Sequence, residues 1–142
     1  MKIGELARIS RCTVETVRYY EKEGLLPAPE RTTGNYRSYG AAHLERLRFI
    51  RNCRALDMAH TEIRALLALT DRPAGDCSAV NQVLDEHIGH VDARIAELSQ
   101  LKNQLTELRR LCQRTNTVES CGILQGLASM ETEPHERHSH LG

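Results

Sequence analysis

Large aromatic side chains are scarce: tryptophan is absent, phenylalanine occurs once, and aromatic residues make up 4% of the 142-residue chain. We therefore expect extended helical packing and not a large compact core. No apolar run reaches the roughly 20 residues that a membrane-spanning helix needs, and the N-terminus lacks the apolar stretch of a secretory signal. These absences predict a cytoplasmic protein without a membrane partner.

The five cysteines include no Cys-x-x-Cys pair, and none lies near a histidine in a pattern typical of a thiol nucleophile. The sequence therefore predicts a protein that is not an enzyme. In a reducing compartment, cysteines serve as free thiols or metal ligands more often than as disulfides.

The net charge is zero, but the two halves differ in sign. Residues 1–70 contain twelve Lys and Arg against eight Asp and Glu, whereas residues 71–142 contain seven against eleven. A modestly basic half followed by an acidic half indicates that only the first half contacts a polyanion.

Short helical patterns separated by turns fill the first 70 residues. Apolar residues predict a first short helix around Leu6, and Thr13 is a suitable cap for a second helix that ends at Gly24. Two short amphipathic helices joined by a tight turn form a helix-turn-helix pattern.

Residues 31–39 follow two prolines and read as a small β-hairpin, or wing, with Gly34-Asn35 at its centre. A second helix pair is predicted at about 42–53 and 60–69, with a turn at Asp57-Met58. The sequence therefore predicts a winged helix-turn-helix domain over residues 1–70.

After a Pro- and Gly-containing hinge at 71–77, residues 78–112 read as one long helix with a heptad-like apolar seam. The seam is too narrow for a globular core and predicts dimerisation through an antiparallel coiled coil; packing back onto the chain's own domain is the alternative. A loop and short helix at 113–127 and a polar tail at 128–142 complete a mainly α fold.

Candidate DNA-reading residues lie on the second helix and on the wing, where they can contact base edges and phosphates. Those of the helix are Thr13, Glu15, Thr16, Arg18 and Tyr19, and those of the wing are Arg31, Asn35, Tyr36 and Arg37.

The run IGELARISRCTVETVRYYEKEGLLPAPERTTGNYRSYG is similar to the opening of MerR-type metalloregulators, and the likeness continues through LERLRFIRNCRALDM and NQVLDEHIGHV to CGILQGL. It covers about residues 1–127 and is greatest for the cadmium- and lead-responsive members. One departure is Ala59, which stands where relatives often have a Ser or Thr that caps the fourth helix.

The resemblance implies a homodimer that binds double-stranded promoter DNA between two promoter elements whose spacing is too long for RNA polymerase. It further implies that metal binding makes the dimer distort the DNA, which realigns these elements and activates heavy-metal resistance genes.

Three cysteines lie at the ends of the long helix: Cys77 precedes it, Cys112 ends it and Cys121 follows nine residues later. At about 1.5 Å per residue the helix separates Cys77 from Cys112 by roughly 50 Å. One chain cannot join them, but an antiparallel dimer places Cys77 of one subunit beside Cys112 and Cys121 of the other. The resemblance agrees, because it matches the three cysteines of the cadmium and lead members.

A three-thiolate site favours soft ions such as Cd(II) and Pb(II), and the helix N-terminus should favour the Cys77 thiolate. Zn(II) prefers a fourth ligand, often His, and residues 113–120 contain no His and only Glu119 as a carboxylate. Hg(II) and Zn(II) remain alternatives, as does a thiol redox sensor on the same fold. A metal chaperone would not need the DNA-reading part.

Histidines give a second, weaker metal signal. His87 and His90 share a face of the long helix, and the tail adds further histidines, so an accessory metal site is an additional hypothesis. The tail histidines are His135, His138 and His140. The remaining cysteines and histidines are expected to be structural: Cys12, Cys53, His43 and His60.

Overall fold

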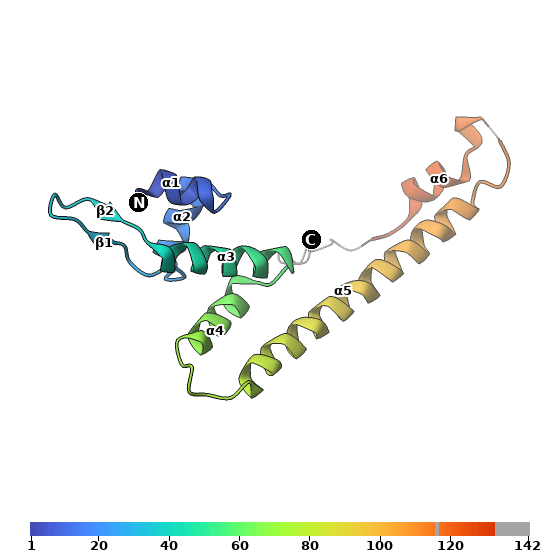
Figure 1. The fold of residues 1–142 in the computed structure, drawn as a ribbon. Coiled ribbons are helices and arrows are strands. Elements are labelled where there is room, and N and C mark those ends of the chain that lie inside the picture. Colours follow the sequence, from blue (N-terminus) through green and yellow to red (C-terminus); the bar gives the residue numbers. More distant parts are fainter. Residues whose placement is uncertain (116, 133–142) are drawn as a thin grey trace. The chain divides into compact units, whose positions relative to one another are not determined.

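The computed structural model describes residues 1–115 and 117–132 and is mainly α-helical (Figure 1). It divides into two compact units, Met1–Val83 and Leu84–Gly142, which are considered separately. Among the described residues, no helix is both long and apolar enough to span a membrane.

The first two helices form the predicted helix-turn-helix. Helix α1 spans Ile3–Ile9 and α2 spans Val14–Lys22. The Thr13 side chain caps α2, since its Oγ1 accepts a hydrogen bond from the Thr16 backbone N–H at 3.1 Å. Gly24, with φ of 74°, ends the segment as predicted because this left-handed conformation is open to glycine at little cost.

The wing is a two-stranded antiparallel hairpin that extends from the N-terminal end of α3 (Figure 1). Strand β1 (Glu30–Arg31) pairs with β2 (Arg37–Ser38). Its turn is placed as predicted, with Asn35 in the left-handed region at φ of 62°.

The second helix pair consists of α3 (Ala41–Ala55) and α4 (His60–Thr70), and a turn through Asp57 at φ of 58° connects them. Ala59 precedes α4 without a side-chain cap, as its identity predicts. The Glu62 carboxylate instead accepts the Ala59 N–H at 2.8 Å, which satisfies one free backbone donor of the helix start.

The core of the first unit brings together one fully buried side chain from each segment: Leu6 of α1, Val17 of α2, Leu25 of the following loop, Ile50 of α3 and Ile63 of α4. Helix α1 contacts both α2 and α3, so this apolar core holds the helix-turn-helix against α3.

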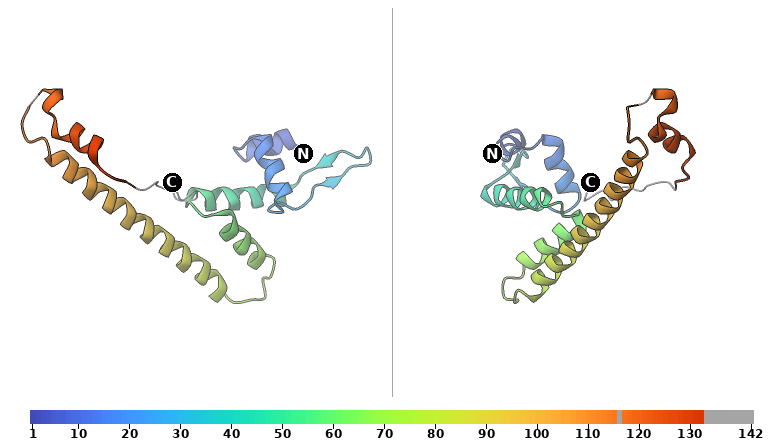
Figure 2. Two further views of the ribbon diagram at one scale, coloured as in Figure 1. Left: turned by 180° about the vertical axis from the view of Figure 1, so that it is seen from behind. Right: turned by 90° about the vertical axis from the view of Figure 1, so that its right-hand side faces the viewer.

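Helix α5 spans Ser78–Arg110 and ends two residues earlier than the sequence pattern predicts. Its last turn tightens, because the Leu111 N–H bonds to the Leu108 carbonyl and the Arg109 guanidinium donates to the Cys112 carbonyl at 2.6 Å. After the short 3₁₀ helix η1 (Val118–Ser120), helix α6 (Gly122–Ser129) folds back beside the end of α5 (Figure 2).

Candidate DNA-reading surface and thiolate site

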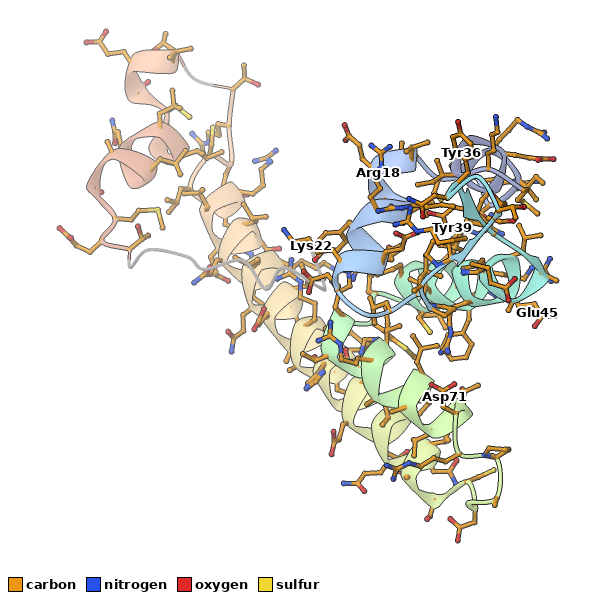
Figure 3. The ribbon with its side chains drawn as sticks, turned by 90° about the vertical axis from the view of Figure 1, so that its left-hand side faces the viewer. Arg18, Lys22, Tyr36, Tyr39, Glu45 and Asp71 are labelled. Atoms are coloured by element: carbon orange, nitrogen blue, oxygen red, sulfur yellow. The ribbon has the colours of Figure 1, made fainter. Side chains whose placement is uncertain are left out.

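The outer face of α2 carries exposed polar side chains, as a helix that enters a DNA groove requires. Glu15, Arg18 and Lys22 are exposed, and Arg18 and Lys22 project from α2 into solvent (Figure 3). The Thr16 hydroxyl lies 2.9 Å from that of Thr13, so the two form a polar pair at the start of the helix.

A cleft of about 630 Å³ separates α2 from the wing. It is lined by Ile3, Arg18, Glu21, Lys22 and Arg37. Three of the five side chains are cationic, which suits a polyanion. Lys22 was not among the residues predicted from sequence, although its position one helical turn after Arg18 was a signal that it belongs to the same surface.

Glu21 of α2 contacts the wing through its side chain. Its carboxylate accepts a hydrogen bond from the Tyr39 hydroxyl and lies 3.4 Å from the Arg37 guanidinium. Burial, reinforced by the hydrogen bond to Glu21, raises the pKa of Tyr39 above its ordinary value. Sequence reasoning did not identify Glu21, because only the folded hairpin brings Arg37 and Tyr39 to it.

Tyr19 contacts the start of α4, where its hydroxyl lies 3.3 Å from Nδ1 of His60. The two rings pack with centroids 5.6 Å apart, and Tyr20 also packs on His60. His60 therefore fixes the C-terminal half of α2 against α4, in line with the structural role expected for it.

The predicted wing residues lie around the hairpin turn. Arg31 donates to the Asn35 carbonyl at 3.2 Å, which braces the turn. Tyr36 is 71% exposed, and its ring packs over Gly34. Tyr36 and the two wing arginines therefore remain available to a ligand from solvent.

His43 has a structural role, as expected. Its Nδ1 accepts the Gly40 N–H at 3.1 Å, and its Nε2 lies 3.2 Å from the Pro27 carbonyl, which assigns the ring proton to Nε2. The ring also packs edge-on against Tyr39 at 5.1 Å, so it joins the start of α3 to the base of the wing.

In the second unit, Cys112 and Cys121 come together. The Cys121 thiol has a lowered pKa, chiefly because the Leu124 N–H donates to its sulfur; the Ile123 N–H and the neighbouring Cys112 thiol add to the effect. Cys121 stands at the N-cap of α6, where the partial positive charge of the helix N-terminus also favours a thiolate. Two sulfurs side by side, one favoured as thiolate, are a suitable donor pair for a soft metal ion.

Close packing of α6 against the end of α5 sets this pairing. A Cβ on Gly122 would lie 2.3 Å from the Leu111 carbonyl oxygen, so only glycine allows this approach. One turn later, a Cβ on Gly126 would lie 2.8 Å from Leu111 Cδ1 and 3.2 Å from Leu108 Cδ1. Gly122 therefore lets the start of α6 dock against the backbone of Leu111, next to Cys112, whereas Gly126 faces only the ends of leucine side chains.

Cys77, the third predicted ligand, is exposed and directly precedes α5. Its carbonyl accepts the Asn81 N–H, and the Asp76 carboxylate accepts the Ser78 N–H at 2.9 Å. Cys77 thus occupies the N-cap position at the opposite end of α5 from Cys112, as the sequence predicts.

The other two cysteines have different surroundings. Cys53 is buried in α3, and Cys12 is partly buried in the turn between α1 and α2. Burial raises the pKa of both thiols, with the Arg51 guanidinium partly opposing the effect at Cys12. Both surroundings fit the structural role expected for them.

His87 and His90 share a face of α5, with ring centroids 6.2 Å apart in an edge-to-face arrangement. His87 is buried and His90 is exposed. The tail histidines of the accessory-site hypothesis, His135, His138 and His140, lie outside the described residues.

A helix-turn-helix with a β-hairpin wing, followed by a long helix with an exposed apolar seam, defines a winged-helix DNA-binding regulator. Residues 1–70 match the sequence profile of MerR HTH family regulatory proteins, and residues 44–108 match that of the MerR DNA-binding region. The chain belongs to the MerR family of metal-responsive transcriptional regulators.

Three relatives illustrate the range of the family. The chain is 52% identical over 109 residues to the HTH-type transcriptional regulator ZntR homolog of Haemophilus influenzae, covering 77% of this chain and 81% of that protein. It is 51% identical to the transcription regulator PbrR691 of Ralstonia metallidurans CH34, solved with lead(II), with a TM-score of 0.80 and coverage of 89% and 98%. Similarity to the mercury(II)-bound MerR of Bacillus megaterium MB1 is lower, at 27% identity, a TM-score of 0.74 and coverage of 91% and 100%.

Proposed function

We propose that the protein is a homodimeric transcriptional activator that senses Pb(II) or Cd(II) through Cys77 of one subunit and Cys112 and Cys121 of the other. It binds promoter DNA through α2 and the wing, and it activates resistance genes by distorting that DNA for RNA polymerase. The observation that carries the proposal is the pairing of Cys112 with Cys121 at the start of α6.

The donor set fits a soft ion. A metal bound there would supply a crosslink between thiolates of two subunits, with the chain's own residues holding the sulfurs in place. Gly122 allows α6 to dock, and the backbone N–H groups of Ile123 and Leu124 stabilise the negative charge on Cys121. The similarity to a lead(II)-bound regulator supports the same ion class.

Dimerisation follows from the apolar seam of α5. Ile88, Ile95 and Leu105 are 54%, 55% and 65% exposed in the single chain, and Leu98 and Leu101 extend the same seam. Such a continuous stripe on one long helix is typical of a coiled-coil interface. An antiparallel partner helix would cover it and bring Cys77 of one subunit to the thiol pair of the other.

The separation of metal sensing from DNA binding can be tested with Cys112→Ser. Reduced wild-type protein and the variant are titrated with Pb(II), Cd(II), Hg(II) and Zn(II), and thiolate-to-metal ultraviolet absorption is recorded. We expect strong Pb(II) and Cd(II) bands only in the wild type. Metal-induced transcription should also be lost in the variant, while affinity for promoter DNA stays nearly unchanged because the DNA-reading residues lie in the other unit. Loss of DNA affinity would contradict the proposal.

Zinc sensing is a second candidate, favoured by the similarity to the ZntR homolog. Zn(II) prefers four ligands, and residues 113–120 offer only Glu119 beyond the cysteines. A higher affinity for Zn(II) than for Pb(II) and Cd(II) in the titration would establish this candidate instead.

Redox sensing is also open, because Cys112 and Cys121 are neighbours. A protein that binds none of the metals but forms a Cys112–Cys121 disulfide on oxidation would establish this candidate.

The histidines would add an accessory site. Deleting residues 131–142 should retain induction but lower the metal stoichiometry, if the tail histidines bind metal together with His87 and His90. Unchanged stoichiometry would exclude the accessory site.

A further inference from the structure

A second cavity of the first unit, separate from the cleft beside the wing, is strongly cationic. It measures about 280 Å³ and lies between the α1–α2 turn and the side of α3. Its described lining consists of Ile9, Ser10, Arg11, Leu44, Arg48 and Arg51. Three of these six side chains are guanidinium groups and none is a carboxylate, so the cavity concentrates positive charge.

The arginines of this cavity are not neutralised by the described residues. Arg37, Arg46 and Arg64 each lie within 4.0 Å of a carboxylate, whereas Arg11, Arg48 and Arg51 form no such pair in the described part of the chain. Three guanidinium groups without a described carboxylate partner therefore line the same cavity.

Ser10 provides an independent indication of a ligand. Its hydroxyl oxygen is inaccessible to solvent and has no hydrogen-bond partner among the described residues. A buried hydroxyl without a partner is unfavourable, so nearly all such groups are satisfied in the functional state. Rotation of the Ser10 side chain toward the cavity would let an oxygen of an anion between the arginines accept this O–H.

The backbone of Arg11 is the third indication. Its φ is 55°, in the left-handed region that favours glycine. Two backbone bonds hold it there: its own N–H donates to the Arg8 carbonyl, and the Cys12 N–H donates to the Ala7 carbonyl at 3.0 Å. A charged residue kept in a strained conformation points to a function for its side chain.

The cavity is continuous with the DNA-reading helix. A smaller adjoining pocket of about 90 Å³ shares Ser10, Arg11 and Arg51 with it and also contacts Thr16 and Tyr20 of α2. The basic surface therefore runs from α2 to the side of α3 and reaches Arg54, which lines the same pocket.

We propose that Ser10, Arg11, Arg48 and Arg51 bind a backbone phosphate of the DNA beside the groove that α2 enters. The proposal rests on the proposed DNA-binding function. Guanidinium groups bind phosphate oxygens in a bidentate manner, and the Ser10 hydroxyl supplies a further donor. A phosphate is favoured over an acidic protein surface because the pocket adjoins α2. The contact extends the footprint of the dimer beyond α2 and the wing and is independent of base sequence.

The test uses the full-length dimer and a short duplex that the wild-type protein selects from a random-sequence pool. Arg48→Ala and Arg11→Gly are measured for DNA affinity between about 50 and 200 mM salt. Losing one phosphate contact per subunit should reduce the slope of log affinity against log salt by about 1.8 per dimer. The ratio of wild-type to variant DNA affinity should therefore fall about 12-fold between about 50 and 200 mM salt.

Two checks separate binding from folding. Arg11→Gly relieves the strained backbone, so its thermal stability should not fall while its DNA affinity does. Arg46→Ala is the matched control, because Arg46 also lies on α3 but pairs with Asp71 at 3.1 Å. Its salt slope should equal that of the wild type.

An unchanged salt slope in both Arg48→Ala and Arg11→Gly would overturn the proposal. If transcription by RNA polymerase fell while DNA affinity and slope stayed unchanged, the ligand would be an acidic protein surface and the proposal would also be wrong. Failure of the wild type to select any duplex would count against the DNA-binding function itself, which is a different result.

Discussion

Replacing Gly122 with alanine tests whether the docking of α6 positions the thiol pair. The new Cβ would lie 2.3 Å from the Leu111 carbonyl oxygen, and a real Cβ essentially never approaches closer than 3.0 Å. The start of α6, and with it Cys121, must therefore move by at least the difference of 0.7 Å. Because binding sites tolerate displacements of only about 0.5 Å, we expect Pb(II) affinity to fall about 10- to 100-fold.

Gly126→Ala is the control within the same helix. Its Cβ would meet only the ends of two leucine side chains, of which the nearer is Leu111 Cδ1 at 2.8 Å, and these can rotate away. Both variants are measured by competition titration with a chelator, following thiolate-to-metal absorption, and both should retain wild-type DNA affinity. Wild-type metal affinity in Gly122→Ala would refute the idea that this contact positions Cys121.

Three further predictions concern single residues. In the reduced, metal-free protein at neutral pH, iodoacetamide should modify Cys121 faster than Cys53, because the pKa of Cys121 is lowered and that of Cys53 is raised; equal rates by mass spectrometry would contradict this. The folded-state pKa of Tyr39 lies above its ordinary value of 10.0, so its contribution to stability is complete below pH 10 and is lost as the pH rises through the raised pKa. The unfolding free energy of Tyr39→Phe should therefore fall less at alkaline pH than that of the wild type. Ala59→Ser should raise the urea unfolding free energy by about 1 kcal/mol by adding a cap to α4, and an unchanged value would show that Glu62 already satisfies this helix start.

Local chemistry made much of the fold predictable from sequence. Thr13 caps α2, Asn35 occupies the left-handed position of the wing turn, and apolar residues that recur every three to four positions indicate the helices. Each of these signals involves neighbours a few residues apart, so the sequence alone contains the physical cause.

Long-range contacts explain what the sequence did not reveal. Glu21 joins Arg37 and Tyr39 only after the hairpin has folded, and Gly122 contacts Leu111 only because the chain folds back between α5 and α6. Likewise, the left-handed backbone conformation of Arg11 is not predicted by its residue type. The spacing of the three cysteines indicated that they are candidate metal ligands, but the mutual placement of Cys112 and Cys121 depends on tertiary packing.

A mixed dimer shows whether each metal site is shared between two subunits. Cys77→Ser and Cys112→Ser proteins are purified separately, unfolded, mixed in equal amounts and refolded, and Pb(II) binding is titrated. Neither variant alone contains an intact site, but a mixed dimer joins an unaltered Cys77 from one chain to unaltered Cys112 and Cys121 from the other. With about half of the dimers mixed, we predict about one quarter of the wild-type binding capacity. No binding above that of the separate variants would show that the three cysteines do not bind metal across the dimer interface.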